Sequence, residues 1–307
     1  MTLVSRALLL TVPLLLFALA GALHTPPPGV DRSDEADIVL DSLPALPTWA
    51  RAPLPDFTGH RDVTERKVAF FSFLYPRIVL ANSRILIERE YLEHLSGKET
   101  LTPDENQWLA RQAERLRVDP ALKGAERFEL LLKRLDIIPP SLIMAQAANE
   151  SAWGTSRFAT QGYNLFGQWC FSKGCGLVPQ SRVQGADHEV EKFSSPYFSL
   201  RSYIQNLNRH PAYQHVRDIR LKDRRTNRPL SGIDLAGGLE SYSERGDAYI
   251  REIRAMIRHN NLTFYDEKFR KLLGDRTPQR FTELASAGAA SALLPGEGQQ
   301  AAHPFEG

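Results

Sequence analysis

Apolar positions recur at helical spacing through most of the chain between about residues 60 and 275. The longest such stretch, Val63 to Leu95, carries apolar side chains in steps of three and four residues, which predicts an amphipathic helix. Pro76 lies inside it and is expected to kink or divide the helix, because proline cannot donate the backbone hydrogen bond. The apolar positions of this stretch are Phe70, Phe71, Leu74, Ile78, Val79, Ile85, Leu86 and Tyr91.

Further helices are predicted where a capping residue precedes an apolar periodicity. Thr102-Pro103 and Ser195-Pro196 each place a hydroxyl before a proline at the first helical position. The first is expected to begin a helix that reaches about Val118. Three more helices are predicted over residues 128–135, 233–242 and 247–259.

The stretch from about Gly162 to Phe193 has glycines and short alternations but no helical period. This pattern favours loops and a small hairpin. The predicted fold class is therefore mainly α, with a minor β part.

The two ends of the chain have a different composition. Arg6 precedes an apolar run from Ala7 to Leu23, which is typical of an export signal within residues 1–23, although an uncleaved membrane anchor is the alternative. Residues 24–59 are proline-rich and predict a linker, and residues 285–307 predict a disordered tail. Between them we expect an N-terminal helical region, 60–135, and a catalytic domain, 136–275. Export would place the protein in the periplasm or cell envelope, and an anchor would attach it to the inner membrane.

Composition excludes several classes of protein. Of 307 residues, 42% are hydrophobic and 24% are charged, which excludes a wholly disordered chain or a polytopic membrane protein. The formal net charge of +2 gives no argument for nucleic acid binding. Cys170 and Cys175 are the two cysteines, and in an oxidising compartment a disulfide between them is favoured. A zinc site with His188 would lack a clear fourth ligand, so we predict no metal and no cofactor.

Residues 141–154, SLIMAQAANESAWG, carry the first sign of chemistry. Pro140 can begin a helix and Gly154 can end it, which places Glu150 in the last turn. The spacing of Ile143, Ala147 and Glu150 puts the carboxylate on an apolar face. Poor hydration and the negative end of the helix dipole would both raise its pKa, as a general acid requires. The alternative is a side chain that projects from the helix end into water.

The pairing of NESAWG with Tyr163-Asn164-Leu165-Phe166-Gly167 resembles glycoside hydrolase family 73, and most closely its Bax-type group. This family comprises β-N-acetylglucosaminidases that cut bacterial cell-wall glycan. The resemblance covers about residues 60–275. Its supporting segments are GQWCFSKGCG, KFSSP, YIQNLNRHPAY and GGLESYSERGDAYIREIRAMI.

The resemblance implies an α+β lysozyme-like fold, in which a helical lobe and a small β-hairpin lobe enclose a glycan-binding cleft. It implies that Glu150 protonates the glycosidic oxygen and that Tyr242 helps to orient the sugar. The family has Tyr-x-Thr-Asp where this chain has Tyr-Ser-Glu-Arg. If the acid beside the tyrosine has a role, the resemblance implies that Glu244 takes the place of the family's aspartate. A core position beside Leu235 and Leu239 is the alternative for Tyr242.

A second catalytic carboxylate is less clearly indicated. Glu189 and Glu191 are the candidates. Glu189 is the better one, because its distance along the sequence from Glu150 is similar to that between the two carboxylates in relatives. The alternative for both residues is a position on a solvated strand edge. Inversion needs carboxyl groups about 6.5–9.5 Å apart, and retention by a protein nucleophile needs about 5–5.5 Å. The substrate's own N-acetyl group could instead attack the anomeric carbon. The sequence leaves these three routes open.

Five residues are predicted to bind sugar. Four supply flat apolar faces for a pyranose ring, and the fifth, Asn164, supplies donors and acceptors for an acetamido group. Packing between the lobes is the alternative for the aromatic residues, above all for Phe166 and Trp153. The four aromatic residues are Tyr163, Phe166, Trp169 and Trp153.

The sequence thus predicts a peptidoglycan hydrolase that cleaves β-1,4 bonds on the N-acetylglucosamine side, with glycan strands as its partner. A lytic transglycosylase or muramidase on the same fold is one alternative, and a non-catalytic glycan-binding protein is another. The basic run from Arg217 to Arg228 predicts a solvated face, with contact to anionic wall polymer or lipid as its functional interpretation.

Overall fold

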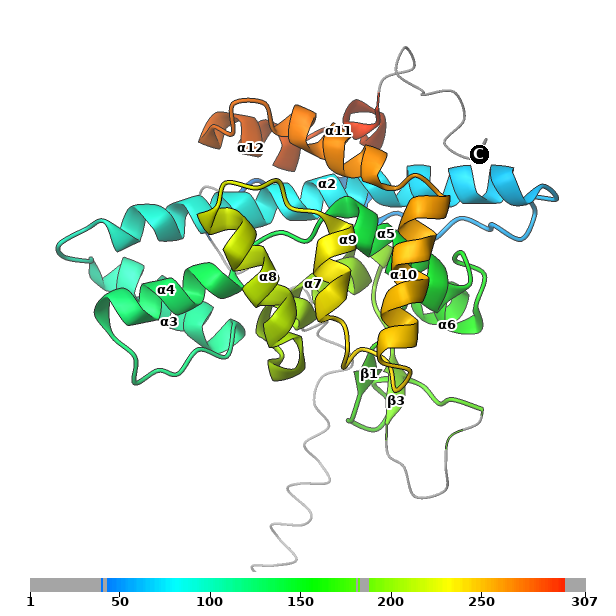
Figure 1. Ribbon diagram of the computed structural model, residues 1–307, viewed down its shortest axis with the longest axis horizontal. Helices are drawn as coiled ribbons and strands as arrows, with labels where there is room; N and C mark the ends of the chain where they lie inside the picture. Colours follow the sequence, from blue (N-terminus) through cyan, green and yellow to red (C-terminus); the bar gives the residue numbers. More distant parts are fainter. Residues whose placement is uncertain (1–39, 41–42, 181, 183–187, 296–307) are drawn as a thin grey trace, which may run out of the picture.

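A computed structural model describes residue 40, residues 43–180, residue 182 and residues 188–295. The expected export signal lies outside these residues. One long helix, α2 (Val63–Ser96), runs through the middle of the molecule (Figure 1). Asp62 caps it by accepting hydrogen bonds from the backbone N–H groups of Thr64 and Glu65.

Helix α2 is surrounded by protein on nearly all sides. It continues through Pro76 as one helix, so the expected division is wrong. It is long and apolar enough to cross a membrane, but 89% of its most apolar window is buried inside the protein, as in the core helix of a globular fold. The helix therefore serves as the axis on which the other helices pack.

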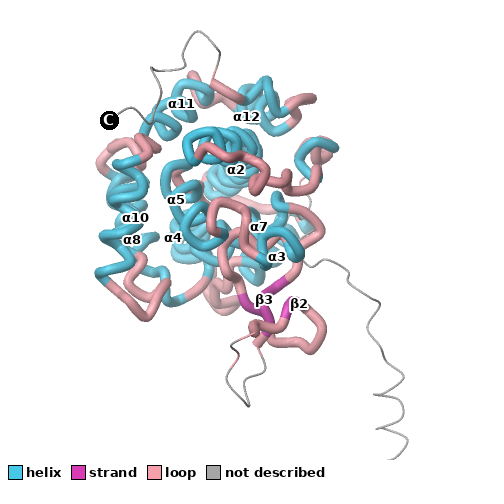
Figure 2. Tube along the Cα trace, turned by 90° about the vertical axis from the view of Figure 1, so that its right-hand side faces the viewer, coloured by secondary structure: helices cyan, strands magenta, loops and turns pink. Residues whose placement is uncertain are grey.

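The other helices form layers on either side of α2. Helices α11 and α12 lie above it and α5, α7, α8 and α10 below, and the quarter-turned view shows the same order (Figures 1 and 2). The bounds of these and the remaining helices are α3 Pro103–Arg115, α4 Gly124–Arg134, α5 Pro140–Ser151, α6 Arg157–Gly162, α7 Pro196–Arg209, α8 Gln214–Arg225, α9 Gly232–Leu235, α10 Asp247–His259, α11 Thr263–Leu273 and α12 Pro278–Ala285, with short 3₁₀ turns η2 Thr48–Arg51, η3 Pro211–Tyr213, η4 Ala236–Gly238 and η5 Ala290–Leu293.

The two helix starts predicted from a hydroxyl residue before proline are confirmed, whereas the helix predicted over 128–135 begins earlier, at Gly124. Thr102 and Glu105 form a reciprocal capping box at the start of α3. Ser195 precedes α7 as expected, but its hydroxyl makes no capping hydrogen bond. The helix expected over 233–242 ends at Gly238, so Tyr242 lies in a turn.

Helix α5 ends in an unusual turn that the sequence predicts only in part. Ala152, Trp153 and Gly154 all have positive φ angles, of 50°, 60° and 77°. A Cβ atom on Gly154 would lie 2.7 Å from the ring of Phe57, so only glycine fits there. The close contact fixes the direction in which the chain leaves the last turn of α5.

The β part is a three-stranded antiparallel sheet rather than a single hairpin. Its strands β1 (Trp169–Cys170), β2 (Gly176–Leu177) and β3 (Glu189–Glu191) are arranged in the order β1-β3-β2. Trp169 lies opposite Val190, and Gly176 lies opposite Glu191. The sheet lies at one edge of the helical body (Figure 1).

The expected linker and tail are packed where the structure describes them, so both expectations are wrong there. Ala50 and Phe57, in the predicted linker, are buried. In the predicted tail, Leu293 is 2% exposed, and the Trp49 indole donates a hydrogen bond of 2.7 Å to the Ala287 carbonyl. Apolar residues spaced too irregularly to show a period still cover the surface of α2.

The basic run from Arg217 to Arg228 is not a solvated face throughout. Arg217 and Arg220 are 3% and 1% exposed. Arg220 donates to several backbone carbonyls, and Arg224 makes two hydrogen bonds, of 3.0 and 2.7 Å, to the carboxylate of Asp136. These arginines join α8 to the chain segment between α4 and α5.

Asp136 is the acid at the centre of this arrangement. Burial alone would raise its pKa, but the charges of Arg224, Arg89 and Arg220 outweigh burial and hold the pKa well below its usual range. Its ionised form therefore stabilises the folded state.

We predict that Asp136→Asn lowers the free energy of unfolding at pH 7 by about 3–5 kcal/mol, because it leaves buried arginines without their counter-charge. The contribution is complete above the unfolded-state pKa of about 4 and is lost as pH falls toward the lower folded-state pKa. The difference between the two proteins should therefore shrink in acid. Urea unfolding at several pH values measures it.

The exposed Glu267 offers a matched control, since Glu267→Gln removes a surface charge and should change stability by less than about 0.5 kcal/mol. A pH-independent difference between Asp136→Asn and the parent protein would contradict the electrostatic explanation.

Candidate active site

Glu150 lies in the last turn of α5, as predicted, and is partly buried. Its Oε1 atom accepts a hydrogen bond of 2.7 Å from the hydroxyl of Tyr249 and one of 3.3 Å from the amide of Asn149. Within the part of the chain that the structure describes, no hydrogen bond reaches Oε2. One carboxyl oxygen is thus held in place and the other is left for a proton.

The surroundings of Glu150 favour that proton. Burial raises the pKa of Glu150, hydrogen bonds from Tyr249 and Asn149 lower it, and the charges of Glu252 and Arg245 act in opposite directions. Burial dominates, so the pKa lies above its usual range. The predicted general acid thus has the electrostatic environment that its role requires.

A chain of three buried side chains holds Glu150 in position. Tyr203 Oη donates to Gln146 Oε1 at 2.5 Å, and Gln146 Nε2 donates to Tyr249 Oη at 2.9 Å. Tyr249 in turn donates to Glu150. Burial and the charge of Glu150 raise the pKa of Tyr249, so its hydroxyl keeps the proton that it donates.

None of these three partners was predicted from the sequence, although two of them carried a signal. Gln146 lies one turn before Glu150 on the same face of α5, and a buried amide there requires partners. Tyr249 ends the segment YSERGDAY, in which roles were predicted for Tyr242 and Glu244 but not for Tyr249. Tyr203 belongs to the apolar face of α7 and gave no sign of a polar role.

Tyr242 lies between the two predicted motifs. Its ring stacks on that of Tyr249 with centroids 5.4 Å apart, and its hydroxyl donates to the Phe166 carbonyl at 3.0 Å. The side chain is partly buried. It therefore contacts the partner of Glu150 on one side and the YNLFG segment on the other.

The YNLFG segment approaches Glu150 at Gly167. A Cβ atom on Gly167 would lie 3.6 Å from Glu150 Oε2, and the residue has a φ of 66°. Phe166 is 2% exposed and stacks on Tyr203, with ring centroids 4.1 Å apart. The structure thus brings NESAWG and YNLFG together and places Phe166 in the core rather than against a ligand.

Asn164 has a different role from the predicted one. Its amide nitrogen donates to the carbonyls of Gln168 and Glu191, and its oxygen accepts from the N–H groups of Phe166 and Gln168. An asparagine amide offers two donors and two lone pairs, so none remains for an acetamido group. Asn164 instead fixes the turn that carries Gly167.

The remaining sugar-binding candidates divide into core and surface. Trp153 packs edge-on against Phe70 and Phe71, with ring centroids 6.0 and 5.3 Å apart. This packing agrees with the alternative that Trp153 is a core residue. Trp169 is 57% exposed and stacks on His188 at 4.1 Å. Tyr163 is partly buried at the end of α6, and Glu244 is exposed in the turn after Tyr242. Trp169 therefore offers the most accessible flat face of this group.

The predicted disulfide between Cys170 and Cys175 is present. Glu189 Oε1 accepts from the Gly174 N–H at 3.0 Å and Oε2 from the Gly176 N–H at 2.8 Å, on either side of Cys175. These two hydrogen bonds lower the pKa of Glu189. Cys170, Cys175 and Glu189 cluster within 4.8 Å, but disulfide-bonded sulfurs offer no thiolate to a metal. The role of Glu189 as a second catalytic carboxylate stays a prediction.

Comparisons with known proteins show to which family the chain is similar. A family model described as mannosyl-glycoprotein endo-β-N-acetylglucosaminidase matches residues 125–262, which include Glu150, Tyr242 and Tyr249. Protein bax of Escherichia coli (strain K12) is 34% identical over 210 residues, which cover 67% of this chain and 74% of that protein. No solved structure matches the chain significantly.

We predict that Tyr249→Phe moves the alkaline limb of the pH–activity profile to higher pH. The hydroxyl stabilises the Glu150 carboxylate, so its removal raises the pKa further and keeps the acid protonated over a wider range. The activity at the optimum should fall, because Glu150 loses a positioning contact. Hydrolysis of purified cell wall as a function of pH measures both effects.

Tyr75→Phe is the matched control for this substitution. Tyr75 is also buried, but its hydroxyl makes no hydrogen bond to any part of the chain that is described. Removal of the Tyr75 hydroxyl should not shift the pH–activity profile. If the pH–activity profile of Tyr249→Phe coincided with that of the parent protein, the hydrogen bond from Tyr249 would have no effect on the pKa of Glu150.

We predict that Glu189→Gln keeps at least about a third of the hydrolytic activity but loosens the disulfide loop. A glutamine can replace only one of the two acceptor oxygens, and a lost hydrogen bond to a charged group costs roughly 1.5–3 kcal/mol. Limited proteolysis near residues 170–190 should be faster. A loss of activity as large as that of Glu150→Gln would instead assign Glu189 the part of the second carboxylate.

Proposed function

This chain belongs to the Bax-type glucosaminidase family, and from that premise we propose that it is an endo-β-N-acetylglucosaminidase that hydrolyses the β-1,4-linked glycan of peptidoglycan. The observation that carries the proposal is the carboxyl group of Glu150. It is partly buried, its pKa is raised, and it has one oxygen without a hydrogen-bond partner among the described residues.

In the proposed reaction, Glu150 Oε2 donates its proton to the glycosidic oxygen as the bond to the anomeric carbon breaks. Over the complete cycle a water molecule supplies the hydroxyl group that the anomeric carbon gains, and the second proton of that water restores Glu150. Protonation of the leaving oxygen is needed because an alkoxide leaves poorly. The carboxylate that results is stabilised by Tyr249, whose hydroxyl already points to Oε1. The same hydrogen bond that lowers the pKa slightly therefore supports Glu150 after proton transfer.

The shape of the neighbouring chain supports access to this proton. Gly167 presents no side chain beside Oε2. Tyr242 holds the Phe166 carbonyl and so keeps Gly167 at this distance. We assign Tyr242 a positioning role, since its hydroxyl is occupied by the backbone. Trp169 is assigned to sugar binding, because it is the exposed aromatic side chain of the sheet that follows Gly167.

The proposed location is outside the cytoplasm, in the periplasm or cell envelope. The disulfide between Cys170 and Cys175 supports this location, because disulfides persist in oxidising compartments. Peptidoglycan lies in the same compartment as the proposed enzyme.

We predict that Glu150→Gln lowers hydrolysis of purified peptidoglycan by about 10²–10⁴-fold, the range over which general acids contribute. Glutamine keeps the shape of the side chain and an oxygen that can accept from Tyr249, so the fold and glycan binding should persist. Mass spectrometry of the released fragments measures the loss. It also identifies the bond that is cut, because hydrolysis on the predicted side leaves reducing N-acetylglucosamine ends.

The exposed Glu129 on α4 provides the control, and Glu129→Gln should digest cell wall like the parent protein. Two results would contradict the proposal. Anhydro-muramic ends would show a lytic transglycosylase instead, and binding of glycan without fragments from the unaltered protein would show a non-catalytic function.

A further inference from the structure

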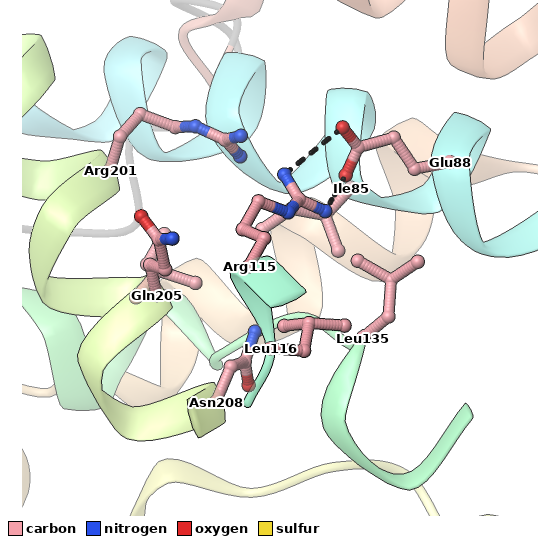
Figure 3. A pocket seen from close by; sticks show the side chains of 9 residues that line it. Ile85, Glu88, Arg115, Leu116, Leu135, Arg201, Gln205 and Asn208 are labelled. Carbon is pink, nitrogen blue, oxygen red and sulfur yellow. Dashed lines mark hydrogen bonds and ion pairs between the residues drawn. The ribbon is translucent and has the colours of Figure 1, made fainter. Parts of the chain in front are cut away.

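A hollow between α2, α3 and α7 brings the ends of two helices together. In Figure 3, Arg115 of α3 reaches Glu88 of α2 through two hydrogen bonds, of 3.2 and 2.8 Å. Leu116, at the end of α3, and Asn208, at the end of α7, line the same hollow. The residues that follow are Arg117 and Arg209, which lie far apart in the sequence but close enough for the charge of Arg117 to act on Arg209.

Five basic residues gather at this junction. We call them the junction cluster, and three of them have structural partners, His210 through the hydrogen bond that its Nδ1 accepts from the Ala212 N–H at 3.2 Å. Arg134 donates to the carbonyls of Leu116 and Arg117, both at 2.6 Å, and Arg217 donates to the carbonyls of Leu207 and His210, both at 2.8 Å. The members of the cluster are Arg117, Arg134, Arg209, His210 and Arg217.

Arg117 and Arg209 have no such partners. Arg117 is exposed and Arg209 is partly buried, and the guanidinium groups of both make no hydrogen bond or ion pair anywhere in residues 43–180 or 188–295. Burial lowers the pKa of Arg209, and the charges of Arg117 and Arg115 lower it further, against the opposite effect of Glu191. Burial lowers the pKa of His210, and Arg117, Arg217 and Arg209 lower it further. Positive charge thus exceeds negative charge at the junction, which favours an anion.

A row of aromatic rings connects the junction cluster to the catalytic carboxyl. Tyr249, which binds Glu150, stacks on Tyr242 at 5.4 Å. Tyr242 lies 5.9 Å from Tyr213, and Tyr213 lies 5.7 Å from His210. The cluster is therefore three ring contacts away from Tyr249. Tyr213 and Tyr249 are 8% and 2% exposed, so these contacts give the proximity of the cluster to Glu150 and not a path for the glycan.

We propose that Arg117 and Arg209 bind the carboxylates of the peptide branches that a peptidoglycan strand carries. This inference rests on the proposed function, since it concerns how the same substrate is held. Guanidinium groups pair with carboxylates through two parallel hydrogen bonds. Within the described residues the terminal Nη donors of both arginines are unused, whereas Arg209 Nε is buried. The junction cluster would thus select a strand that bears peptides over bare glycan.

The test compares two substrates in a protein that cannot cleave either. In a Glu150→Gln background, the double substitution Arg117→Gln, Arg209→Gln is assayed for co-sedimentation with intact peptidoglycan and with glycan freed of its peptides by an amidase. Affinity for intact peptidoglycan should fall about 10-fold, and affinity for the bare glycan should not change. The difference should shrink as salt is raised.

Arg225→Gln, at an exposed position at the end of α8 outside the cluster, is the matched control and should bind both substrates normally. Unchanged affinity of the double variant for intact peptidoglycan would overturn the inference, and so would an equal loss with both substrates, which would indicate damage to the fold. The binding assay does not depend on cleavage. If the unaltered protein failed to hydrolyse cell wall, the proposed function would be refuted, and the binding assay would still test this inference.

Discussion

The hydrogen bond from Tyr249 to Glu150 joins the end of α5 to α10 at the point where the protein must keep a carboxyl group out of water. Burial makes the ionised form costly, and the phenol hydroxyl partly offsets that cost. Without burial the group would lose its proton well below neutral pH. Without the Tyr249 hydroxyl, Oε1 would keep only the longer hydrogen bond from Asn149, at 3.3 Å. The site depends on the balance between these two effects.

The packing of α5 makes this balance possible. The helix is buried along almost its whole length against α2, α10 and α11, and its first turn is tied down where Ser141 binds Asp266. Its other end is fixed by Gly154 against Phe57. A helix held at both ends cannot turn its last residues toward solvent. Glu150 therefore stays beside Gly167 rather than projecting into water, which was the alternative left open by the sequence.

Local patterns predicted the parts of the fold and site that depend on local chemistry. The capping box of α3, the place of Glu150 in the last turn of α5 and the pairing of the cysteines all follow from residues close together in the chain. The role of Tyr249 could not be predicted in this way, because it comes from contact between helices separated by about a hundred residues. Arg220 was misjudged for the same reason, since its partners are Asp136 and backbone carbonyls more than eighty residues away. Arg217 was misjudged although its partners, the carbonyls of Leu207 and His210, lie close to it in the chain. Asn164 was predicted to bind an acetamido group, but its own turn and the Glu191 carbonyl of β3 already satisfy its polar atoms.

A pair of opposite charges beside the site leaves burial as the deciding influence on Glu150. Arg245 and Glu252 form an ion pair of 2.6 Å, with side chains 59% and 38% exposed. Glu252 raises the pKa of Glu150 and Arg245 lowers it. Since the two charges lie together, their effects on a third group largely cancel, and solvent screens what remains. The proton of Glu150 is therefore governed by how little water reaches it, and this property belongs to the packed helices rather than to any one neighbouring charge.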